Sequence, residues 1–438
     1  MTSGNNVVYY EYDNKRRLRK VTLNGTETNF IVSDNDEVEV TIRDGVIFRT
    51  VKDKDGNVIR TELNESVQTE RVYEDGLLKS VTDNVAQTTT NYEYNPDRTL
   101  SKISNGQVTE EYTYNERNEI TGKKITSGET THNYKYSYKE NAAREIDYIE
   151  MPYGVRSYVL RDVNGRYTGR ELKSGTGNKV YGEYISYRKV GDRATNMPSA
   201  VWYANGNAIK ENIKYKYDAC GNITEIAENG KLTARYEYDG LNRLVREDNK
   251  KFGKTWVYTY DNCGNITCKR EFVFTLRDRE QLEELESTEK LYGYDGDRLI
   301  SYDGEECSYN SAGVPVTYRG KPVIWRKVTQ LIHYNGTVFE YDGFGRRIKK
   351  GNIRYYYDNE GKLIKQSNGI QYIYDKSGVS GFRYERGEYI YRKNAQGDIT
   401  HILDYCENIV AEYAYDAWGN CTIVKDTAGA IWIRSVKI

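Results

Sequence analysis

Apolar and polar residues alternate along most of the chain in short runs, which are interrupted by Gly, Asn and Asp. The clearest stretch is residues 215–248, YKYDACGNITEIAENGKLTARYEYDGLNRLVRED, which contains one unit twice. In the first copy Tyr215 and Tyr217 are two residues apart, so both rings share one face of an extended strand. The carboxylate of Asp218 can accept hydrogen bonds from backbone N–H groups of a turn, and Gly221 tolerates the positive φ that such a turn needs. The unit therefore predicts a β-hairpin.

This unit recurs with a nearly constant period. Tyr217, Tyr238 and Tyr260 each precede an Asp, at spacings of 21 and 22 residues. A period of about 20 residues indicates a repeat architecture, in which each unit is stable only against its neighbours. We take the recurring residues as the candidate structural sites of the chain: Tyr217, Asp218, Gly221, Asn222, Tyr238, Asp239, Tyr260, Asp261, Gly264, Asn265, Tyr294, Asp295, Tyr341, Asp342, Gly345, Tyr357, Asp358, Gly361, Tyr374, Asp375, Tyr415, Asp416, Gly419 and Asn420.

The repeats predict the organisation of the whole chain. Residues 1–214 carry weak copies and residues 215–388 carry clear ones, so 1–388 is expected to form one strip of hairpins, and the pattern changes in 389–438. No linker rich in Gly, Ser or Pro interrupts the strip, which favours a single domain. The DKDGN stretch from Asp53 predicts a hairpin turn rather than a calcium loop, because its Gly is in the fourth place. The charged segment 279–289 predicts a hairpin loop with a helical turn.

Composition narrows the class of protein. The 438 residues hold 64 Lys and Arg against 65 Asp and Glu, so no basic surplus is present to bind nucleic acid. Tyr occurs 43 times against 8 Phe, and a Tyr ring suits a surface that is apolar at one end and wet at the other. We expect a thin sheet with two partly solvated faces rather than a thick packed interior. No apolar run is long enough to span a membrane, and the first residues do not read as a secretory signal.

Catalytic, metal-binding and cofactor motifs are not predicted. The Asp of each repeat occupies the same turn slot, which favours a structural role over catalysis. His132, His333 and His401 are far apart in the sequence and are expected in strand or surface positions. The six Cys form no CxxC pair, which favours free thiols but leaves a disulfide open. The five Trp are expected to pack on the sheet, with a sugar-stacking platform as the alternative.

The motifs YKYDACGN, YEYDGLNR, YTYDNCGN and YAYDAWGN resemble those of the Rhs/YD-repeat family of bacterial polymorphic toxins, toxin-complex shell subunits and teneurins. The stretch RKNAQGDITHILDYCENIVAEYAYDAWGN resembles the opening of the Rhs-associated core of that family. The resemblance implies an all-β fold in which antiparallel hairpins form a spiralling, curved sheet, here an incomplete hollow shell. It also implies that 389–438 is the truncated beginning of the core. The Asp-Pro self-cleavage site of the family has no counterpart here.

The expected function is a non-enzymatic structural module, a shell segment of a secreted or cell-surface toxin that encapsulates a C-terminal toxin polypeptide. The expected partners are that cargo or the remaining part of the shell, with no nucleic acid and no membrane span. Two alternatives remain: a repeat module that binds cell-wall glycans, and a glycosidase, which would need two carboxylates about 5–10 Å apart in a cleft.

Overall fold

Consecutive segments of alternating apolar and polar residues form consecutive strands in the computed structural model. The structure describes residues 2–3, 6–23, 26–33, 35–43, 45–140, 145–191, 193–206, 208–310, 313–326, 329–406 and 408–426. Residues 427–438, the end of the expected core segment 389–438, and Trp432 with them, lie outside the described residues. Within the described part the fold is an antiparallel array of hairpins, which confirms the all-β prediction.

The first run of strands extends from the N-terminus to residue 306. Its members are β1 Thr2–Ser3, β2 Asn6–Tyr12, β3 Leu18–Leu23, β4 Thr26–Val32, β5 Val38–Arg43, β6 Val46–Lys52, β7 Val58–Leu63, β8 Ser66–Glu74, β9 Leu77–Asp83, β10 Thr88–Tyr94, β11 Leu100–Ser104, β12 Thr109–Tyr114, β13 Ile120–Ser127, β14 Thr130–Tyr138, β15 Ile146–Glu150, β16 Arg156–Arg161, β17 Tyr167–Lys173, β18 Lys179–Val190, β19 Arg193–Asn205, β20 Ala208–Tyr217, β21 Ile223–Glu228, β22 Lys231–Tyr238, β23 Leu244–Asn249, β24 Lys254–Tyr260, β25 Ile266–Val273, β26 Thr288–Asp295, β27 Arg298–Tyr302 and β28 Glu305–Glu306.

The second run follows directly. Its members are β29 Ser308–Tyr309, β30 Pro315–Tyr318, β31 Lys321–Arg326, β32 Gln330–Tyr334, β33 Thr337–Tyr341, β34 Arg347–Lys350, β35 Ile353–Tyr357, β36 Leu363–Gln366, β37 Gln371–Asp375, β38 Gly378–Tyr384, β39 Gly387–Lys393, β40 Ile399–Asp404, β41 Ile409–Tyr415 and β42 Cys421–Asp426. The helical pieces in the described residues are short: a 3₁₀ turn at Pro152–Gly154 and α1, Arg279–Leu282. Helix α1 lies in the loop between β25 and β26, which confirms the predicted hairpin loop with a helical turn.

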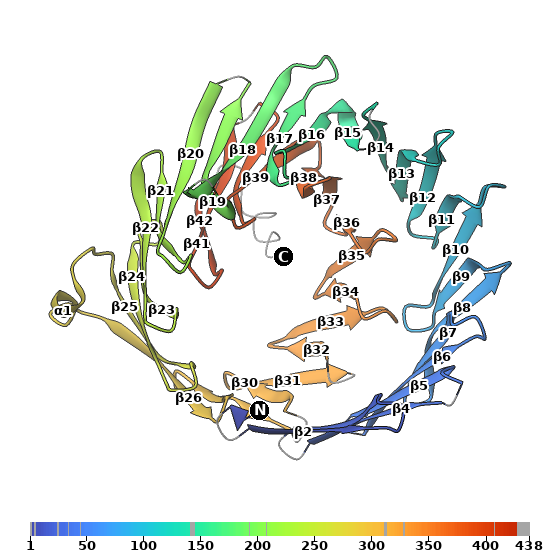
Figure 1. Cartoon of the computed structure of the whole chain (residues 1–438), viewed down its shortest axis with the longest axis horizontal. Coiled ribbons are helices and arrows are strands. Elements are labelled where there is room, and N and C mark those ends of the chain that lie inside the picture. Colours follow the sequence, from blue (N-terminus) through green and yellow to red (C-terminus); the bar gives the residue numbers. More distant parts are fainter. Residues whose placement is uncertain are drawn as a thin grey trace.

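Each strand pairs with the next one along the chain, so the array is a continuous meander within each run. The first run traces a wide outer arc that begins near the label of β2 and returns to the same side at β26 (Figure 1). The second run then passes inside this arc, along β10–β13 and below β16–β20 (Figure 1). The chain is therefore an open spiral of about two turns, and the sheet does not close on itself. This confirms the predicted spiralling strip.

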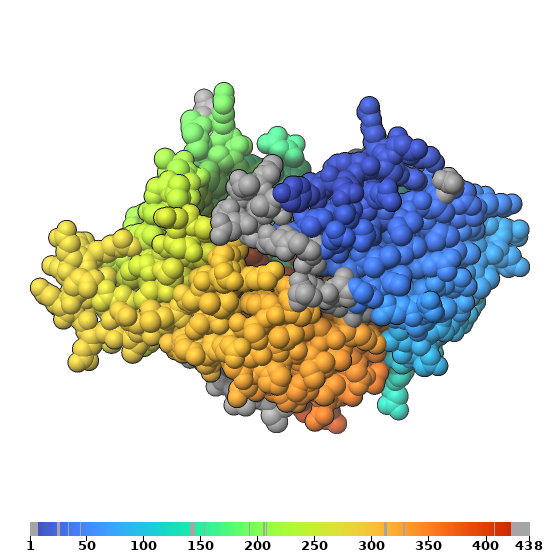
Figure 2. All heavy atoms as spheres, turned by 90° about the horizontal axis from the view of Figure 1, so that it is seen from below, coloured from blue at the N-terminus to red at the C-terminus, as the bar shows by residue number. Residues whose placement is uncertain are grey.

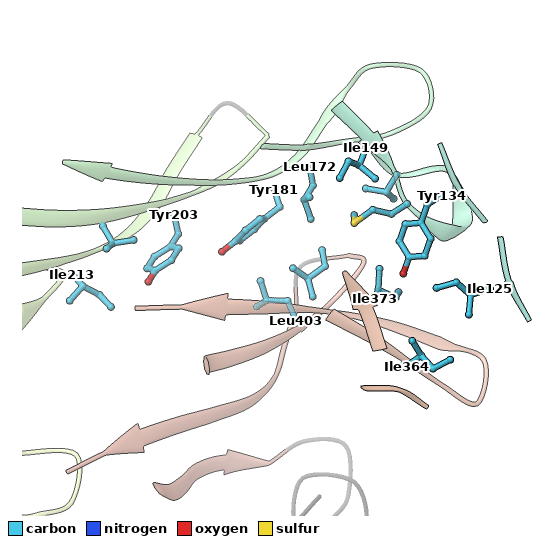
Figure 3. Packing of buried hydrophobic residues seen from close by; sticks show 14 of the residues in the cluster. Ile125, Tyr134, Ile149, Leu172, Tyr181, Tyr203, Ile213, Ile364, Ile373 and Leu403 are labelled. Carbon is cyan, nitrogen blue, oxygen red and sulfur yellow. The ribbon is translucent and has the colours of Figure 1, made fainter. Parts of the chain in front are cut away.

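The hydrophobic core lies between the two turns of the spiral. Leu172, Tyr181 and Tyr203 point from the outer arc toward Ile373 and Leu403 of the second run (Figure 3). These side chains are almost completely buried, and the residues of the outer arc come from alternate positions of their strands. The expectation of a thin sheet is wrong for this part of the spiral, because stacking gives the sheet a packed second layer. Tyr supplies much of that layer, as its abundance suggested.

The opposite side of the spiral exposes several apolar side chains among the described residues. Strand β2 exposes Tyr9, Tyr10 and Tyr12, and the later strands expose Ile324 and Val338. The first strands and the segment around β26–β33 lie next to each other on this side (Figure 2). No helix among the described residues is long and apolar enough to cross a membrane.

Candidate functional site: the seam between the two turns

The turn of each repeat is built by its Asp. The Asp218 carboxylate accepts a hydrogen bond from the backbone N–H of Asn222 at 2.8 Å and a second one from the Asn222 side chain at 2.9 Å. Gly221 has a φ of +91°, the conformation that the turn chemistry predicted for it. The same pair of bonds recurs from Asp261 to Asn265 and from Asp416 to Asn420, as backbone and side-chain contacts. The Asp residue therefore closes the turn.

When the fourth residue after the Asp is Arg, an ion pair replaces the amide. Arg243 Nε lies 2.7 Å from Asp239, and its guanidinium lies 4.7 Å from the ring centroid of Tyr260, the Tyr of the next repeat. Arg346 makes the same two contacts with Asp342 and Tyr357. The turn is thus coupled to the neighbouring unit by a cation–π contact.

Hydroxyl groups link one repeat to the next. The Tyr238 hydroxyl donates to the carbonyl oxygen of Ile223, the first residue of the strand that follows the preceding turn. Ile223 pairs with Tyr217 at a point where the register shifts between Lys216 and Tyr217, and such a bulge interrupts the regular ladder of backbone hydrogen bonds. Tyr238 lies at the equivalent shift of its own strand. The hydroxyl therefore supplies a partner to a carbonyl at an irregular point of the ladder. The bond recurs at Tyr94, Tyr114, Tyr138, Tyr187, Tyr217, Tyr260, Tyr357, Tyr374 and Tyr415.

The structure places the remaining candidate residues in related positions. Tyr294 and Tyr341 lie at the same register shift as Tyr238. Gly264, Gly345, Gly361 and Gly419 all have positive φ in the turn. Asp295 differs, because it pairs with Arg298 across a two-residue turn and so lies in the ladder.

Four repeat aspartates of the second run are buried, whereas the repeat residues Asp218, Asp239 and Asp261 of the outer arc are only half-buried. Asp342, Asp358, Asp375 and Asp416 are each at most 7% exposed. Asp358, Asp375 and Asp416 meet side chains of the first run across the interface between the two runs, which we call the seam. The seam brings together residues far apart in the sequence, such as the Gly343 N–H and the Asp83 carboxylate, which are 260 positions apart and lie at 2.6 Å.

At the centre of the seam, Arg170 of β17 is fully buried and donates to Asp375 at 3.1 Å, to the Ser380 hydroxyl at 2.7 Å and to the carbonyl of Tyr391 at 2.6 Å. Ser157 donates to the same carboxylate at 2.9 Å. Burial acts to raise the pKa of Asp375, but Arg170 and the hydroxyl donors outweigh it and hold the pKa below its usual value. The carboxylate stays ionised inside the protein.

Two further polar clusters lie along the seam. At one end Glu247 accepts the backbone N–H of Ala417 at 3.0 Å and the side-chain amide of Asn249 at 3.0 Å. Burial raises the pKa of Glu247 to about 7, and the nearby Asp416 adds to this rise. At the other end Lys123 lies 3.0 Å from Glu110 and 3.2 Å from Asp358.

Aspartates of the outer arc behave differently. Side-chain hydrogen bonding from Asn222 holds the pKa of Asp218 below its usual value, and backbone hydrogen bonding from Arg243 does the same for Asp239. These carboxylates stay ionised because their own turn satisfies them. No charge partner from the other turn of the spiral is needed.

A cavity of about 360 Å³ lies between the turns near β20–β23 and β41, with Tyr215, Tyr236, Lys251, Gln396 and Asp398 among its lining residues. Its walls are mixed in polarity and hold no group of metal ligands among the residues that the structure describes. A second cavity of about 420 Å³ lies beside Trp418.

Other predicted positions are located as follows. The carboxylate of Asp53 accepts the backbone N–H of Asn57 at 2.9 Å, so DKDGN is a turn. His132 and His401 are buried in β14 and β40, and His333 is half-buried in β32. No disulfide joins the six Cys, all of which the structure describes. Trp256 is buried and Trp418 is half exposed.

The first-run charges of the seam were not predicted from the sequence. Arg170, Lys123 and Glu247 lie inside strands next to other charged residues and match no motif. Their position within the strand could have indicated them. Each lies on the strand face that, in other strands, carries buried apolar residues, and a charge on such a face needs a partner.

Comparison with known proteins gives a sequence relative. No family model matches the chain. Residues of this chain are 30% identical over 203 positions to the tRNA3(Ser)-specific nuclease WapA of Bacillus spizizenii and to the tRNA nuclease WapA of Bacillus subtilis. The matched segment is 42% of this chain and 8% of each relative, so the chain spans a small part of their length.

Solved structures of similar shape include a Tc holotoxin pore from Photorhabdus luminescens, with a TM-score of 0.42, 12% identity and coverage of 95% of this chain and 30% of that one. A TcdB2–TccC3 complex gives a TM-score of 0.39 at 12% identity, with 96% and 31% coverage. At these TM-scores the shapes carry no weight for function. The fold and the WapA relationship confirm the resemblance to Rhs/YD-repeat proteins that the motifs indicated.

Proposed function

We propose that this chain is a non-enzymatic shell segment of a secreted or cell-surface polymorphic toxin, and that it encapsulates a toxin polypeptide that follows it. Residues 1–388 are the YD-repeat strip in this proposal and 389–438 are the beginning of the core. The observation that carries the proposal is the second turn, which runs inside the outer arc (Figure 1). Strand β42, Cys421–Asp426, lies on that inner side of the arc (Figure 1).

The seam supports this role because it makes the wall rigid. Without the seam, each repeat of the strip would contact only its neighbours along the chain. Arg170 and Asp375, 205 residues apart, fix one turn of the spiral on the other. A wall that surrounds a cargo must keep its curvature while the cargo is absent or unfolded. The fixed register between the turns meets that need.

A protease-protection experiment tests the proposal. The same unfolded, protease-sensitive reporter is fused either after Ile438 or before Met1 of the full chain, and its half-life in dilute protease is measured. Encapsulation requires the C-terminal reporter to survive at least about tenfold longer than the N-terminal one. Equal half-lives would remove the encapsulation role, because the two fusions share one sequence and one shell.

A glycan-binding module is the second candidate, and one observation favours it. Trp418 is half exposed, packs edge-on against Tyr258 at 5.5 Å and borders the cavity that also holds Tyr292 and Lys290. Exposed aromatic faces beside polar groups suit sugar rings. Retention on peptidoglycan that is lost in Trp418→Ala and kept in Trp202→Ala would support this candidate, and no retention would remove it.

A further inference from the structure

One contact of the seam differs in chemistry from the others. Buried cations elsewhere on it are arginines, such as Arg170 and Arg392. Lys123 is the one lysine that is buried in the described part of the chain. A guanidinium is always protonated, whereas an amine becomes a nucleophile when it gives up its proton.

The amine of Lys123 is surrounded by three carboxylates. Its Nζ lies 3.0 Å from Glu110 Oε2, 3.2 Å from Asp358 Oδ2 and 3.2 Å from Glu360 Oε1. Lys123, Glu110 and Asp358 are buried, while the side chain of Glu360 is 50% exposed. Glu360 is therefore hydrated, and hydrogen bonding from Lys362 helps to keep its pKa low despite partial burial. The carboxyls of Glu110 and Asp358 are instead shielded from water together with the amine.

Hydrogen bonds divide the roles between these two carboxyls. Glu110 is held by the hydroxyl of Tyr112 on Oε2 and by the backbone N–H of Asn359 on Oε1, each at 2.6 Å. Asp358 receives the backbone N–H of Lys362 on Oδ1 at 2.8 Å, and its Oδ2 faces the amine. When the Lys123 amine attacks Cγ of Asp358, the backbone N–H of Lys362 would therefore stabilise Oδ1, and Oδ2 would be the oxygen that leaves.

We infer that Lys123 and Asp358 are the site of an intramolecular isopeptide bond, an amide between Lys123 Nζ and Asp358 Cγ that covalently joins the two turns. The reaction is a condensation that needs no oxidant and no cofactor. One Nζ–Cγ bond forms, the Cγ–Oδ2 bond breaks, and one water leaves. Glu110 acts as the general base, taking a proton from the attacking amine and returning it to the departing oxygen.

The reaction needs the amine of Lys123 to lose a proton within the cluster. Burial raises the pKa of Asp358, so this carboxyl is a ready acceptor for the proton that the amine must lose. Burial also acts to lower the pKa of Lys123, but the surrounding carboxylates outweigh it and raise the pKa. The resting pair is therefore ionised, and the raised pKa of Lys123 opposes loss of its proton. The reaction passes through a minor state in which one proton has moved from Lys123 to Asp358, which gives a neutral amine and a neutral acid without exchange with solvent.

Intact-mass spectrometry of the purified full chain tests the bond. The expected mass is one water below that of the linear chain without the bond, and peptide mapping is expected to find Lys123 joined to Asp358. A full-length mass with no loss of water overturns the inference, and so does a link to Glu110 or Glu360. The result is independent of the encapsulation role, which the reporter experiment addresses.

Three variants sharpen the test. Lys123→Arg keeps the cation and the ion pairs but cannot form the amide, so its mass is expected to equal that of its own linear chain, with no loss of water. Glu110→Gln keeps both reacting groups and removes the base, and bond formation in freshly folded protein is expected to slow about a hundredfold or more. Lys124→Arg, at the exposed neighbouring position, is expected to retain the loss of water. An unchanged rate in Glu110→Gln would remove Glu110 from the mechanism.

Discussion

The guanidinium of Arg170 and the carboxylate of Asp375 lie 3.1 Å apart although 205 residues separate them. Each side chain is at most 1% exposed to solvent. The pair holds β17 of the outer arc against the turn after β37. It shows that the spiral is fixed by a polar contact as well as by the apolar core around it.

Loss of one member of this pair leaves the other buried and uncompensated. We expect Asp375→Asn and Arg170→Met each to lower the free energy of unfolding by about 3–5 kcal/mol. The double variant is expected to lose less than the sum, because neither Arg170 nor Asp375 is left facing a missing partner, although Glu183, 3.7 Å from Arg170, loses its own cation in both variants that lack Arg170. Equilibrium urea unfolding of the four proteins measures this coupling.

The exposed pair of Lys124 and Glu111, at 2.6 Å, is the matched control. Its removal is expected to change stability by less than about 1 kcal/mol. Equal losses at the buried and exposed pairs would contradict the role assigned to the seam.

Hydroxyl links between repeats are testable one at a time. Tyr238→Phe removes the bond to the Ile223 carbonyl without changing the ring, and we expect a loss of about 1 kcal/mol in the free energy of unfolding. Tyr10→Phe, on an exposed ring, is the control and is expected to cost nothing measurable. Urea midpoints that fall equally in both variants would argue against the link.

Turn geometry gives a prediction about glycine. Gly264 has a φ of +90° and open space around it, so Gly264→Ala is expected to cost about 1 kcal/mol through backbone strain alone. Gly240 lies in the turn of the preceding repeat, with open space but without a left-handed φ. Gly240→Ala is therefore expected to be neutral or slightly stabilising, and thermal unfolding of the two variants measures the contrast.

Glu247 predicts a pH dependence of the seam. Its pKa in the folded protein is about 7, above the ordinary value of 4.5, so the folded state binds the proton more tightly than the unfolded state. The stabilisation from that proton is complete below about pH 4.5 and is lost as the pH rises through about 7. It amounts to at most about 3 kcal/mol.

Glu247→Gln imitates the protonated side chain, so its stability relative to the natural chain is expected to improve steadily between about pH 5 and 8. Urea unfolding of both proteins across this range measures the difference. Lys269 and Asp416, the charged groups that face Glu247, are present in both proteins. A constant difference would show that Glu247 does not titrate in this range.

Local pattern was enough to predict the repeating unit. The period of the Tyr-Asp pairs, the turn formed by Asp218 and the positive φ of Gly221 all follow from residues within a few positions of one another. The helical turn at Arg279–Leu282 was predicted for the same reason. The expectation of a thin sheet failed because the face of a strand does not reveal whether another turn will cover it.

The sequence by itself determined the hairpins, their order and the chemistry of each turn, because backbone propensity and turn hydrogen bonds act over a few residues. Only the tertiary structure decided which repeats stack. Asp218 and Asp375 look alike in the sequence, yet one closes a solvated turn and the other is buried against Arg170. The difference comes from the curvature of the whole strip, which brings residues more than 200 positions apart into contact.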